Sequence, residues 1–331
     1  MAADSFIAFV ERFPEHLAAA KLLGSDVKVS GVDKVVVAGM GGSAIAGNLL
    51  QSYCYEKAPQ LSVQVSRGYD VPGHVDKSTL VLAISYSGNT EETLSAVKSA
   101  MRKGAKVVVV VSGGKLKQQA EQLNKLVVEV PEGIQPRASV PYLFIPLLNI
   151  LHNSGLIPDP SDEISASINS LRATAGSYKE RAKSLAEKLV GKVPLVYASD
   201  KMAGVAYRWK TQFNENAKIH AFTHVFPELN HNELVGFSKL NANYYVIILE
   251  DEADSRRIKE RMRLTKEVAA SKNVPSTQIV IKGDSILTRI LSAVHIGDLA
   301  SVYLAKLTGV DPEPVEIIEN FKKELGKVPF V

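Results

Sequence analysis

Two short segments of the sequence combine glycines with hydroxyl side chains, a composition typical of phosphate-binding turns. The first, from Gly39 to Ser43, follows an apolar run and opens a helical pattern. Its glycines let the backbone approach a ligand, and the free N–H groups at the start of a helix attract anions. The second, from Ser85 to Thr90, adds three Ser and Thr hydroxyls and another glycine before a helical pattern. Together they predict a site for a phosphate monoester.

The first segment has two other interpretations. It can be a tight strand-to-helix turn that only needs small residues. It also fits the G-x-G-x-x-A pattern of dinucleotide folds through Gly39, Gly41 and Ala44. A dinucleotide fold predicts an acidic residue after the next strand, yet the run Leu61–Val65 is followed by Ser66-Arg67. An NADP site stays open as an alternative, because it does not need that carboxylate.

Three further side chains are of types that take part in acid–base chemistry. Moving a proton on a bound phosphate ester needs a base, a positive charge beside the developing oxyanion and a group that can both donate and accept a proton. Glu215, Arg137 and His231 can supply these, although such residues more often lie on a solvated surface or in a salt bridge. By composition His220 and His224 are as eligible as His231, and the three lack the spacing of a zinc site.

The elements that must position these residues alternate between β-branched runs and helical patterns. This alternation predicts an α/β fold with parallel sheets flanked by helices on both faces, a Rossmann-like three-layer sandwich. The predicted strands are Lys34–Ala38, Leu61–Val65, Thr79–Ile84, Lys106–Val111, Lys125–Val130, Pro194–Ala198, Tyr244–Leu249 and Gln278–Ile281. Four prolines between Pro131 and Pro146 predict a loop there rather than a long helix.

Both halves of the chain open in the same way. The run Lys34–Ala38 and the run Pro194–Ala198 are each followed by a turn and then a helical pattern, and only the first turn is glycine-rich. We interpret this as a pseudo-repeat of one α/β unit. A length of 331 residues also predicts two domains. We place them at residues 1–155 and 193–331, joined by a helical linker at 156–192.

Composition narrows the class of protein. With 39 Lys and Arg against 35 Asp and Glu, and no basic run, a nucleic-acid partner is not expected. The single cysteine, Cys54, excludes an intramolecular disulfide and fits a reducing compartment. The N-terminus lacks the pattern of a secretory signal, and no uninterrupted apolar stretch is long enough to span a bilayer. We expect a cytoplasmic protein without a membrane partner.

At these motifs the chain resembles the SIS (sugar isomerase) family and, within it, the bifunctional phosphoglucose/phosphomannose isomerases. The motifs that carry the resemblance are GMGGSAIAG, SYSGNTEET, PRASVPYL, FNENAK, PELNHNE and GVDP. The resemblance implies two SIS domains in one chain, a homodimer, and no metal or nucleotide cofactor. It implies interconversion of glucose 6-phosphate and fructose 6-phosphate, and of mannose 6-phosphate, by proton transfer through a cis-enediolate.

The resemblance also implies which residues hold the phosphate. Gly42 and Ser43 lie in the first loop and would face the substrate. Ser85, Ser87 and Thr90 would bind the 6-phosphate.

Four residues receive catalytic roles from the same motifs. Glu215 corresponds to the base, and Arg137 to the arginine near the reacting carbons. His231 corresponds to the histidine that opens the sugar ring and reaches in from the partner subunit. Lys322 corresponds to a lysine near the ring oxygen. Val315 departs from the pattern, because some members with strong mannose activity have a threonine about there.

Two other functions stay open from the residues. One is a SIS-type sensor that binds a sugar phosphate without catalysis; such sensors usually carry an additional partner domain, and none is apparent here. The other is an NADP-dependent oxidoreductase that uses the glycine-rich turn.

Overall fold

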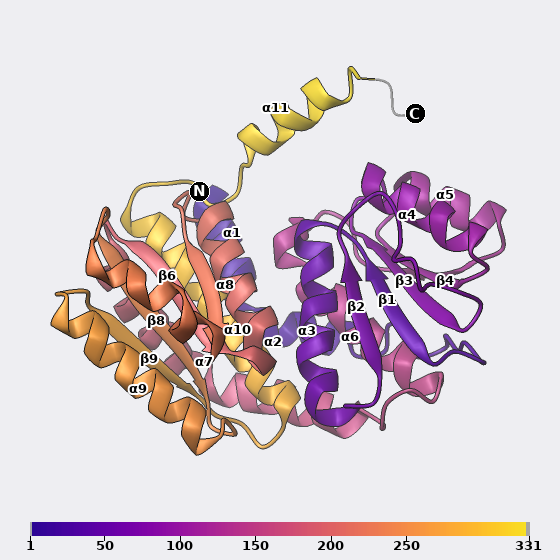
Figure 1. Cartoon of the computed structure of the whole chain (residues 1–331). Helices are drawn as coiled ribbons and strands as arrows, with labels where there is room; N and C mark the ends of the chain where they lie inside the picture. The colour runs from indigo at the N-terminus through magenta and orange to yellow at the C-terminus, as the bar shows by residue number, and fades with distance from the viewer. Residues whose placement is uncertain (1, 329–331) are drawn as a thin grey trace.

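The computed structural model describes residues 2–328, so the predicted domain ends at 1 and 331 lie outside the described residues. Two parallel sheets with helices against their faces form the two halves of the molecule (Figure 1). The N-terminal sheet has the strand order β2-β1-β3-β4-β5, and the C-terminal sheet has the order β7-β6-β8-β9.

The N-terminal sheet is built as its sequence predicts. Strands β1, β3 and β4 carry near-continuous valine, leucine and isoleucine, and they are buried because helices cover both faces of the sheet. Its elements are β1 (Lys34–Ala38), α3 (Gly41–Lys57), β2 (Ser62–Ser66), β3 (Thr79–Ser85), α4 (Glu91–Arg102), β4 (Lys106–Val111), α5 (Gly114–Gln122) and β5 (Leu126–Glu129).

The prediction of a loop between Pro131 and Pro146 is wrong in its second half. A short 3-10 turn, η1 (Pro136–Ala138), leads into the helix α6 (Val140–Asn153). Pro141 lies in the first turn of α6, where its missing N–H costs nothing. Pro146 lies inside the helix, but every residue from Val140 to Leu151 is buried, and this apolar burial offsets the lost hydrogen bond.

Two short helices precede the first sheet, α1 (Ala2–Glu11) and α2 (Phe13–Ala20). They bury Phe6, Val10 and Phe13 in the core.

The C-terminal half repeats the strand–helix alternation around a smaller sheet. Its elements are α7 (Ser161–Leu189), β6 (Val193–Ser199), η2 (Asp200–Met202), α8 (Ala203–Glu215), β7 (Phe222–Phe226), η3 (Glu228–His231), η4 (Glu233–Ser238), β8 (Tyr244–Asp251), α9 (Arg256–Ser271), β9 (Ser276–Ile281), α10 (Ile286–Leu307) and α11 (Glu316–Leu325). The edge strand β7 was not predicted, because only one of its residues is fully buried and its sequence, Phe-Thr-His-Val-Phe, gives no continuous apolar run.

Helices join the two halves. One hydrophobic cluster includes residues of α3, α6, α8 and α10, so the core is continuous between the sheets. Helices α3 and α8 pack closely: a Cβ at Gly204 would lie 2.5 Å from the carbonyl oxygen of Asn48. In residues 2–328, one helix, α10, is long and apolar enough to cross a membrane, but 89% of its apolar window is buried inside the protein, as in a core helix.

Candidate active site

The two predicted phosphate loops lie side by side at the carboxyl ends of the adjacent strands β1 and β3. The Ser43 hydroxyl is buried and accepts a hydrogen bond from the backbone N–H of Tyr86 at 3.2 Å, which ties the first loop to the second. Because the hydroxyl accepts this bond, its own hydrogen is available for a ligand. The structure therefore brings Ser43 to the same edge as the Ser85–Thr90 loop.

The second loop is held in one shape by its glycine. Gly88 has φ +65°, and a Cβ there would lie 1.8 Å from the carbonyl oxygen of Gly113 in the loop after β4. The Ser85 hydroxyl donates to Thr90 Oγ1 at 3.0 Å, and the Ser87 hydroxyl accepts from the backbone N–H of Asn89 at 3.3 Å. The hydroxyl hydrogens of Ser87 and Thr90 remain to donate to an anion at the start of α4.

Arg137 lies directly against the first loop. A Cβ at Gly42 would meet the Pro136 carbonyl oxygen at 2.7 Å and the Arg137 Cα at 3.2 Å, so only glycine allows η1 to approach this closely. The Arg137 side chain is 2% exposed and its guanidinium lies 5.0 Å from the centre of the Phe6 ring. Burial lowers the pKa of Arg137, although Glu215 acts in the opposite direction.

A buried polar network fixes Arg137 from the C-terminal half. Its Nε donates to Asn216 Oδ1 at 2.6 Å, and Asn216 Nδ2 in turn donates to the Ser301 hydroxyl at 2.8 Å. The Arg208 guanidinium donates to the Arg137 carbonyl oxygen at 2.8 Å and to the Asp298 carboxylate at 2.6 Å. Burial raises the pKa of Asp298, while Arg208 opposes that shift. These contacts position Arg137 relative to α8.

The segment between α10 and α11 also binds Arg137. One guanidinium nitrogen donates to the carbonyl oxygens of Pro312 and Glu313, at 2.5 and 2.7 Å. The GVDP motif thus contributes backbone acceptors beside the predicted catalytic arginine.

Glu215 is the last residue of α8 and is half-buried. It precedes Asn216, the partner of Arg137, and is the strongest source of negative charge acting on that arginine. Lys218, at φ +56°, donates to the backbone carbonyl oxygens of Glu215 and Pro312. Burial lowers the pKa of Lys218, and the charge of Arg137 lowers it further. The negative charge of Glu215 therefore acts on both Arg137 and Lys218 at the boundary of the two halves.

Sequence reasoning missed Asn216 and Lys218 as site residues. Both belong to the FNENAK motif that singled out Glu215, so the motif was the available signal.

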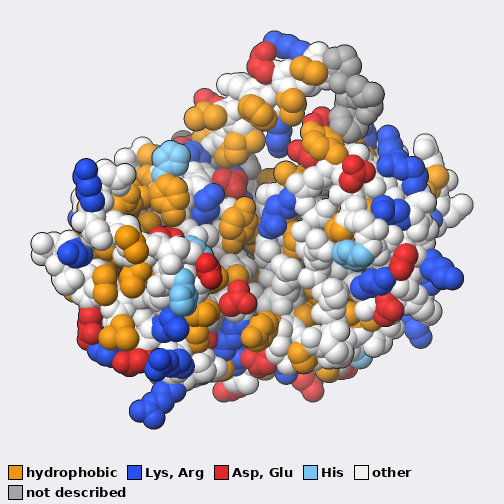
Figure 2. Space-filling model, in the orientation of Figure 1, with side chains coloured by type: hydrophobic (Ala, Val, Ile, Leu, Met, Phe, Trp, Pro, Cys, Tyr) orange, Lys and Arg blue, Asp and Glu red, His pale blue; other side chains and the backbone are white. Residues whose placement is uncertain are grey.

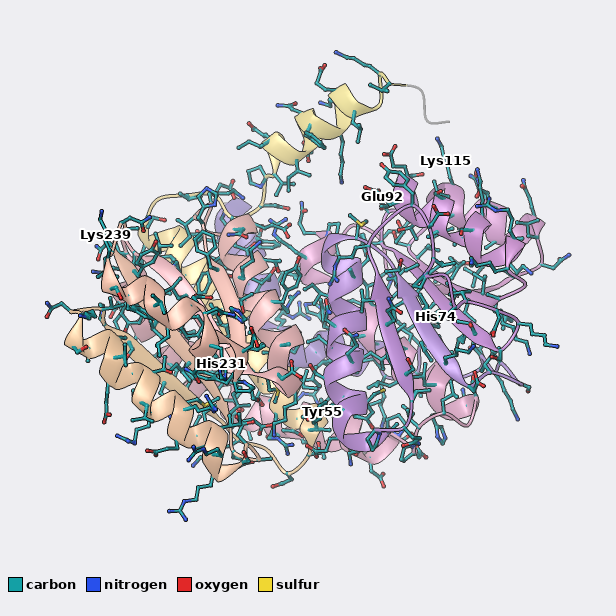
Figure 3. The ribbon with its side chains drawn as sticks, in the orientation of Figure 1. Tyr55, His74, Glu92, Lys115, His231 and Lys239 are labelled. Atoms are coloured by element: carbon teal, nitrogen blue, oxygen red, sulfur yellow. The ribbon has the colours of Figure 1, made fainter. Side chains whose placement is uncertain are left out.

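The structure does not bring His231 and Lys322 to this cluster. His231 ends η3 on the C-terminal half and is exposed (Figure 3), and within residues 2–328 its ring makes no hydrogen bond or ion pair. Lys322 lies on α11, which extends away from both halves and buries none of its residues. Figure 2 shows hydrophobic side chains along this helix. Ile317 and Phe321 of α11 are exposed.

The arrangement can bind an anion and move a proton near it. Hydroxyls and helix N-termini lie together at the ends of β1 and β3, an arrangement that stabilises an anion, and Arg137 lies where Gly42 meets η1. In the described part of the chain, no group of three or more His, Cys, Asp or Glu side chains is placed to hold a metal ion.

Comparison with protein families covers both halves. Residues 28–142 match the SIS domain family, and residues 178–325 match the bacterial phospho-glucose isomerase C-terminal SIS domain. These matches confirm the predicted α/β fold with two SIS domains.

Several curated relatives align over most of the chain. A bifunctional phosphoglucose/phosphomannose isomerase of Caldicellulosiruptor bescii is 40% identical over 334 aligned positions, which cover 96% of this chain and 98% of the relative. One from Thermoplasma volcanium is 37% identical and covers 90% and 93%. A D-glucosamine-6-phosphate 4-epimerase of Sulfolobus acidocaldarius is 34% identical and covers 89% and 90%.

Solved structures share the fold at low sequence identity. A hypothetical protein of Thermus thermophilus superimposes with a TM-score of 0.74 at 16% identity, covering 98% of this chain and 90% of that one. The C-terminal domain of a glucosamine-fructose-6-phosphate aminotransferase from Francisella tularensis gives 0.72 at 15% identity, covering 92% and 97%.

Proposed function

The chain belongs to the bifunctional phosphoglucose/phosphomannose isomerases of the SIS family, and from this membership we propose its reaction. The protein is a sugar-phosphate isomerase. We propose that it interconverts glucose 6-phosphate and fructose 6-phosphate, and also mannose 6-phosphate, through a cis-enediolate.

The proposed mechanism follows from the order of groups along the site. The Ser87 and Thr90 hydroxyls, with Ser43 and Ser85 beside them, hold the 6-phosphate at the start of α4. Glu215 takes the C2 proton of the open-chain aldose, and the C–H electron pair forms the C1–C2 double bond of the enediolate. Arg137 stabilises the negative charge on the oxygens. Glu215 then returns the proton to C1, while the proton on the C2 oxygen passes to the C1 oxygen, so that C2 becomes the ketone and C1 carries the hydroxyl.

One observation carries this proposal: the first phosphate loop, the arginine and the carboxylate form one connected unit. Gly42 packs against Arg137, Arg137 bonds to Asn216, and Asn216 follows Glu215. Loop and base come from different halves of the chain, so the fold itself sets the distance between phosphate and proton acceptor. A dinucleotide-binding site does not need a carboxylate from the other half of the chain near its glycine-rich turn.

We further propose a homodimer in which His231 opens the sugar ring in the partner's site. The exposure of His231, with no partner in the described chain 2–328, supports this role. In the same dimer, the partner subunit would cover the exposed apolar residues of α11, and Lys322 on this helix would reach the ring oxygen of the sugar. The domain bounds 1–155 and 193–331 with the linker at 156–192, the absence of a cofactor and a cytoplasmic location are parts of the same proposal.

A coupled assay tests the reaction. Purified protein given fructose 6-phosphate should form glucose 6-phosphate without added metal or nucleotide, and mannose 6-phosphate should be converted too. Glucosamine 6-phosphate belongs in the same assay, because one relative is an epimerase of that compound. Binding without turnover would favour a sensor, and turnover that requires NADP would favour an oxidoreductase. Either outcome would contradict the proposal.

A further inference from the structure

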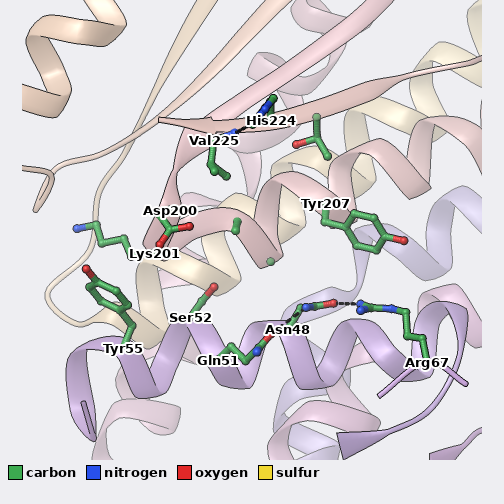
Figure 4. A pocket seen from close by; sticks show the side chains of 13 residues that line it. Asn48, Gln51, Ser52, Tyr55, Arg67, Asp200, Lys201, Tyr207, His224 and Val225 are labelled. Atoms are coloured by element: carbon green, nitrogen blue, oxygen red, sulfur yellow. Dashed lines mark hydrogen bonds between the residues drawn. The ribbon is translucent and has the colours of Figure 1, made fainter. Parts of the chain in front are cut away.

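A cavity lies between the two halves, and neither Arg137 nor Glu215 lines it. It holds about 580 Å³ and is enclosed by α3 on one side and by the turn after β6 with strand β7 on the other (Figure 4). Polar side chains of both halves line it, among them Ser52 and Tyr55 of α3 and Asp200 and Tyr207 of the C-terminal half.

The pseudo-repeat explains where this cavity lies. The strand Lys34–Ala38 and its copy Pro194–Ala198 are 160 positions apart, which is 194 minus 34. When the same offset of 160 positions is applied to the helices that follow, Tyr55 near the end of α3 corresponds to Glu215 at the end of α8. Glu215 reaches the site at the turn after β1, and Tyr55 reaches the cavity at the turn after β6. The cavity is therefore the pseudo-symmetric counterpart of the active site.

The counterpart has lost the parts that bind phosphate and move protons. The offset replaces the Ser43 hydroxyl by Ala203 and the base Glu215 by Tyr55. The central strands pair Lys34 with Thr79 and Pro194 with Tyr245, so Ser85, six residues beyond Thr79, corresponds to Asp251, six residues beyond Tyr245.

In the C-terminal half, the protein's own carboxylates occupy the position that corresponds to the second phosphate loop. Asp251 is fully buried and binds Lys201 at 2.8 Å and Arg289 at 2.7 Å. Asp254 also binds Lys201, at 3.3 Å. The positive charge at this turn is therefore neutralised internally, and an added phosphate would face two buried carboxylates.

The oxygens of four side chains line the cavity without a hydrogen-bond or ion-pair partner among residues 2–328. Ser52 is only 4% exposed, and its hydroxyl points into the cavity (Figure 4). Among residues 2–328, no hydrogen bond or ion pair engages the side-chain oxygens of Ser52, Asp200, Tyr55 or Tyr207. A nearly buried hydroxyl without a partner costs free energy unless a ligand or water completes it.

We propose that this cavity is a second, non-catalytic binding site for a neutral polyol of hexose size. The carboxylate of Asp200 accepts from ligand hydroxyls, the Ser52 hydroxyl donates or accepts, and the two tyrosine rings offer apolar faces to C–H groups. Arg67 lies at the mouth of the cavity but does not give the site a preference for anionic ligands. Its guanidinium already bonds to Asn48 and stacks on Tyr207 at 5.2 Å.

Saturation-transfer NMR with glucitol on the full-length protein tests this site. Glucitol has no carbonyl group to isomerise, and an excess of fructose 6-phosphate blocks the candidate active site. We expect a glucitol signal that persists in that excess, with a Kd of about 1–10 mM. Asp200→Ala and Tyr207→Ala should weaken binding at least tenfold while isomerase activity remains.

The control is Asp26→Ala, which removes another exposed aspartate outside the cavity and should leave glucitol binding unchanged. The proposal is overturned if glucitol gives no signal, if fructose 6-phosphate abolishes the signal, or if both cavity variants bind as the wild type does. Displacement of glucitol by inorganic phosphate would contradict a preference for neutral ligands. Because activity is measured in the same samples, failure of this site is distinguishable from failure of the proposed reaction.

Discussion

Glu215 illustrates what a side chain's surroundings add to its type. A glutamate at the end of a helix is ordinary, but the charge of this one acts on a buried arginine that Asn216 and two backbone carbonyls fix in place. A carboxylate held beside a fixed positive charge suits a reaction in which a proton leaves carbon and negative charge appears on oxygen.

We expect Glu215→Gln to lower kcat by about 10²–10⁴. The inhibition constants of sugar phosphates should stay within several-fold, because the phosphate loops are untouched. Steady-state kinetics of the fructose 6-phosphate reaction measure both quantities. Glu187→Gln, at an exposed position of α7, is the matched control and should behave as the wild type does. Near-normal turnover in the Glu215 variant would show that another group is the base.

His295 should make stability depend on pH. Its ring is 1% exposed and stacks on Phe13 at 5.2 Å, and burial lowers its pKa from 6.5 to about 4. Below pH 6.5 the His295 ring binds a proton in the unfolded chain, whereas in the folded chain it stays neutral down to about pH 4. Its contribution to the free energy of unfolding should therefore fall by up to roughly 3 kcal/mol as the pH decreases through this window.

Urea unfolding between pH 4 and 7 measures this contribution as the difference between the wild type and His295→Gln. The variant should lose less stability on acidification. Identical pH dependences for the two proteins would contradict the assignment.

The residue types of the site were predictable only in part. Motifs selected Glu215 and Arg137, but the contacts of Asn216 and Lys218 depend on a left-handed turn after α8 and on a segment nearly a hundred positions further along the chain. Such long-range partners are not visible in local spacing.

The loop after β3 depends on the left-handed backbone conformation of Gly88. Gly88→Ala would place a Cβ 1.8 Å from the Gly113 carbonyl oxygen in a residue with φ +65°. We expect the free energy of unfolding to fall by about 1–3 kcal/mol and the inhibition constants of sugar phosphates to rise at least tenfold. Chemical denaturation and inhibition assays measure the two effects.

Gly68→Ala is the control for this variant, because its Cβ would meet no atom within 4 Å. It should change neither quantity appreciably. Unchanged sugar-phosphate binding in Gly88→Ala would show that the loop shape does not matter for the ligand.

Elements with a strong local signal were predicted well, and those shaped by tertiary packing were not. Strands β1 and β4 have the predicted bounds because buried valine runs specify them. Helix α6 was missed because its prolines suggested a loop, while its burial in the core was invisible in the sequence. Strand β7 was missed because an edge strand has little apolar signal.

Within one chain, the predicted catalytic residues do not lie in one cluster. His231 is exposed on the C-terminal half, and α11 carries Lys322 away from the core with its apolar residues uncovered. The sequence motifs named both residues but contain no information on which subunit they serve. A dimer in which each subunit completes the other's site accounts for both observations.

Mixing two inactive variants tests the shared site. Homodimers of Glu215→Gln and His231→Ala are exchanged into heterodimers, each of which has one site with both residues intact if His231 acts across the interface. If about half of the dimers are heterodimers and each has one active site of two, the mixture should have about a quarter of wild-type activity. No recovery, with heterodimers verified by mass, would show that His231 acts within its own chain, and an active His231→Ala homodimer would show that it has no role.

The most direct test of the account is the crystal structure of Glu215→Gln with fructose 6-phosphate. The account predicts phosphate oxygens about 3 Å from the hydroxyls of Ser43, Ser87 and Thr90. It also predicts C1 and C2 between residue 215 and Arg137. A phosphate bound elsewhere, for example in the cavity beside Asp200, would contradict it.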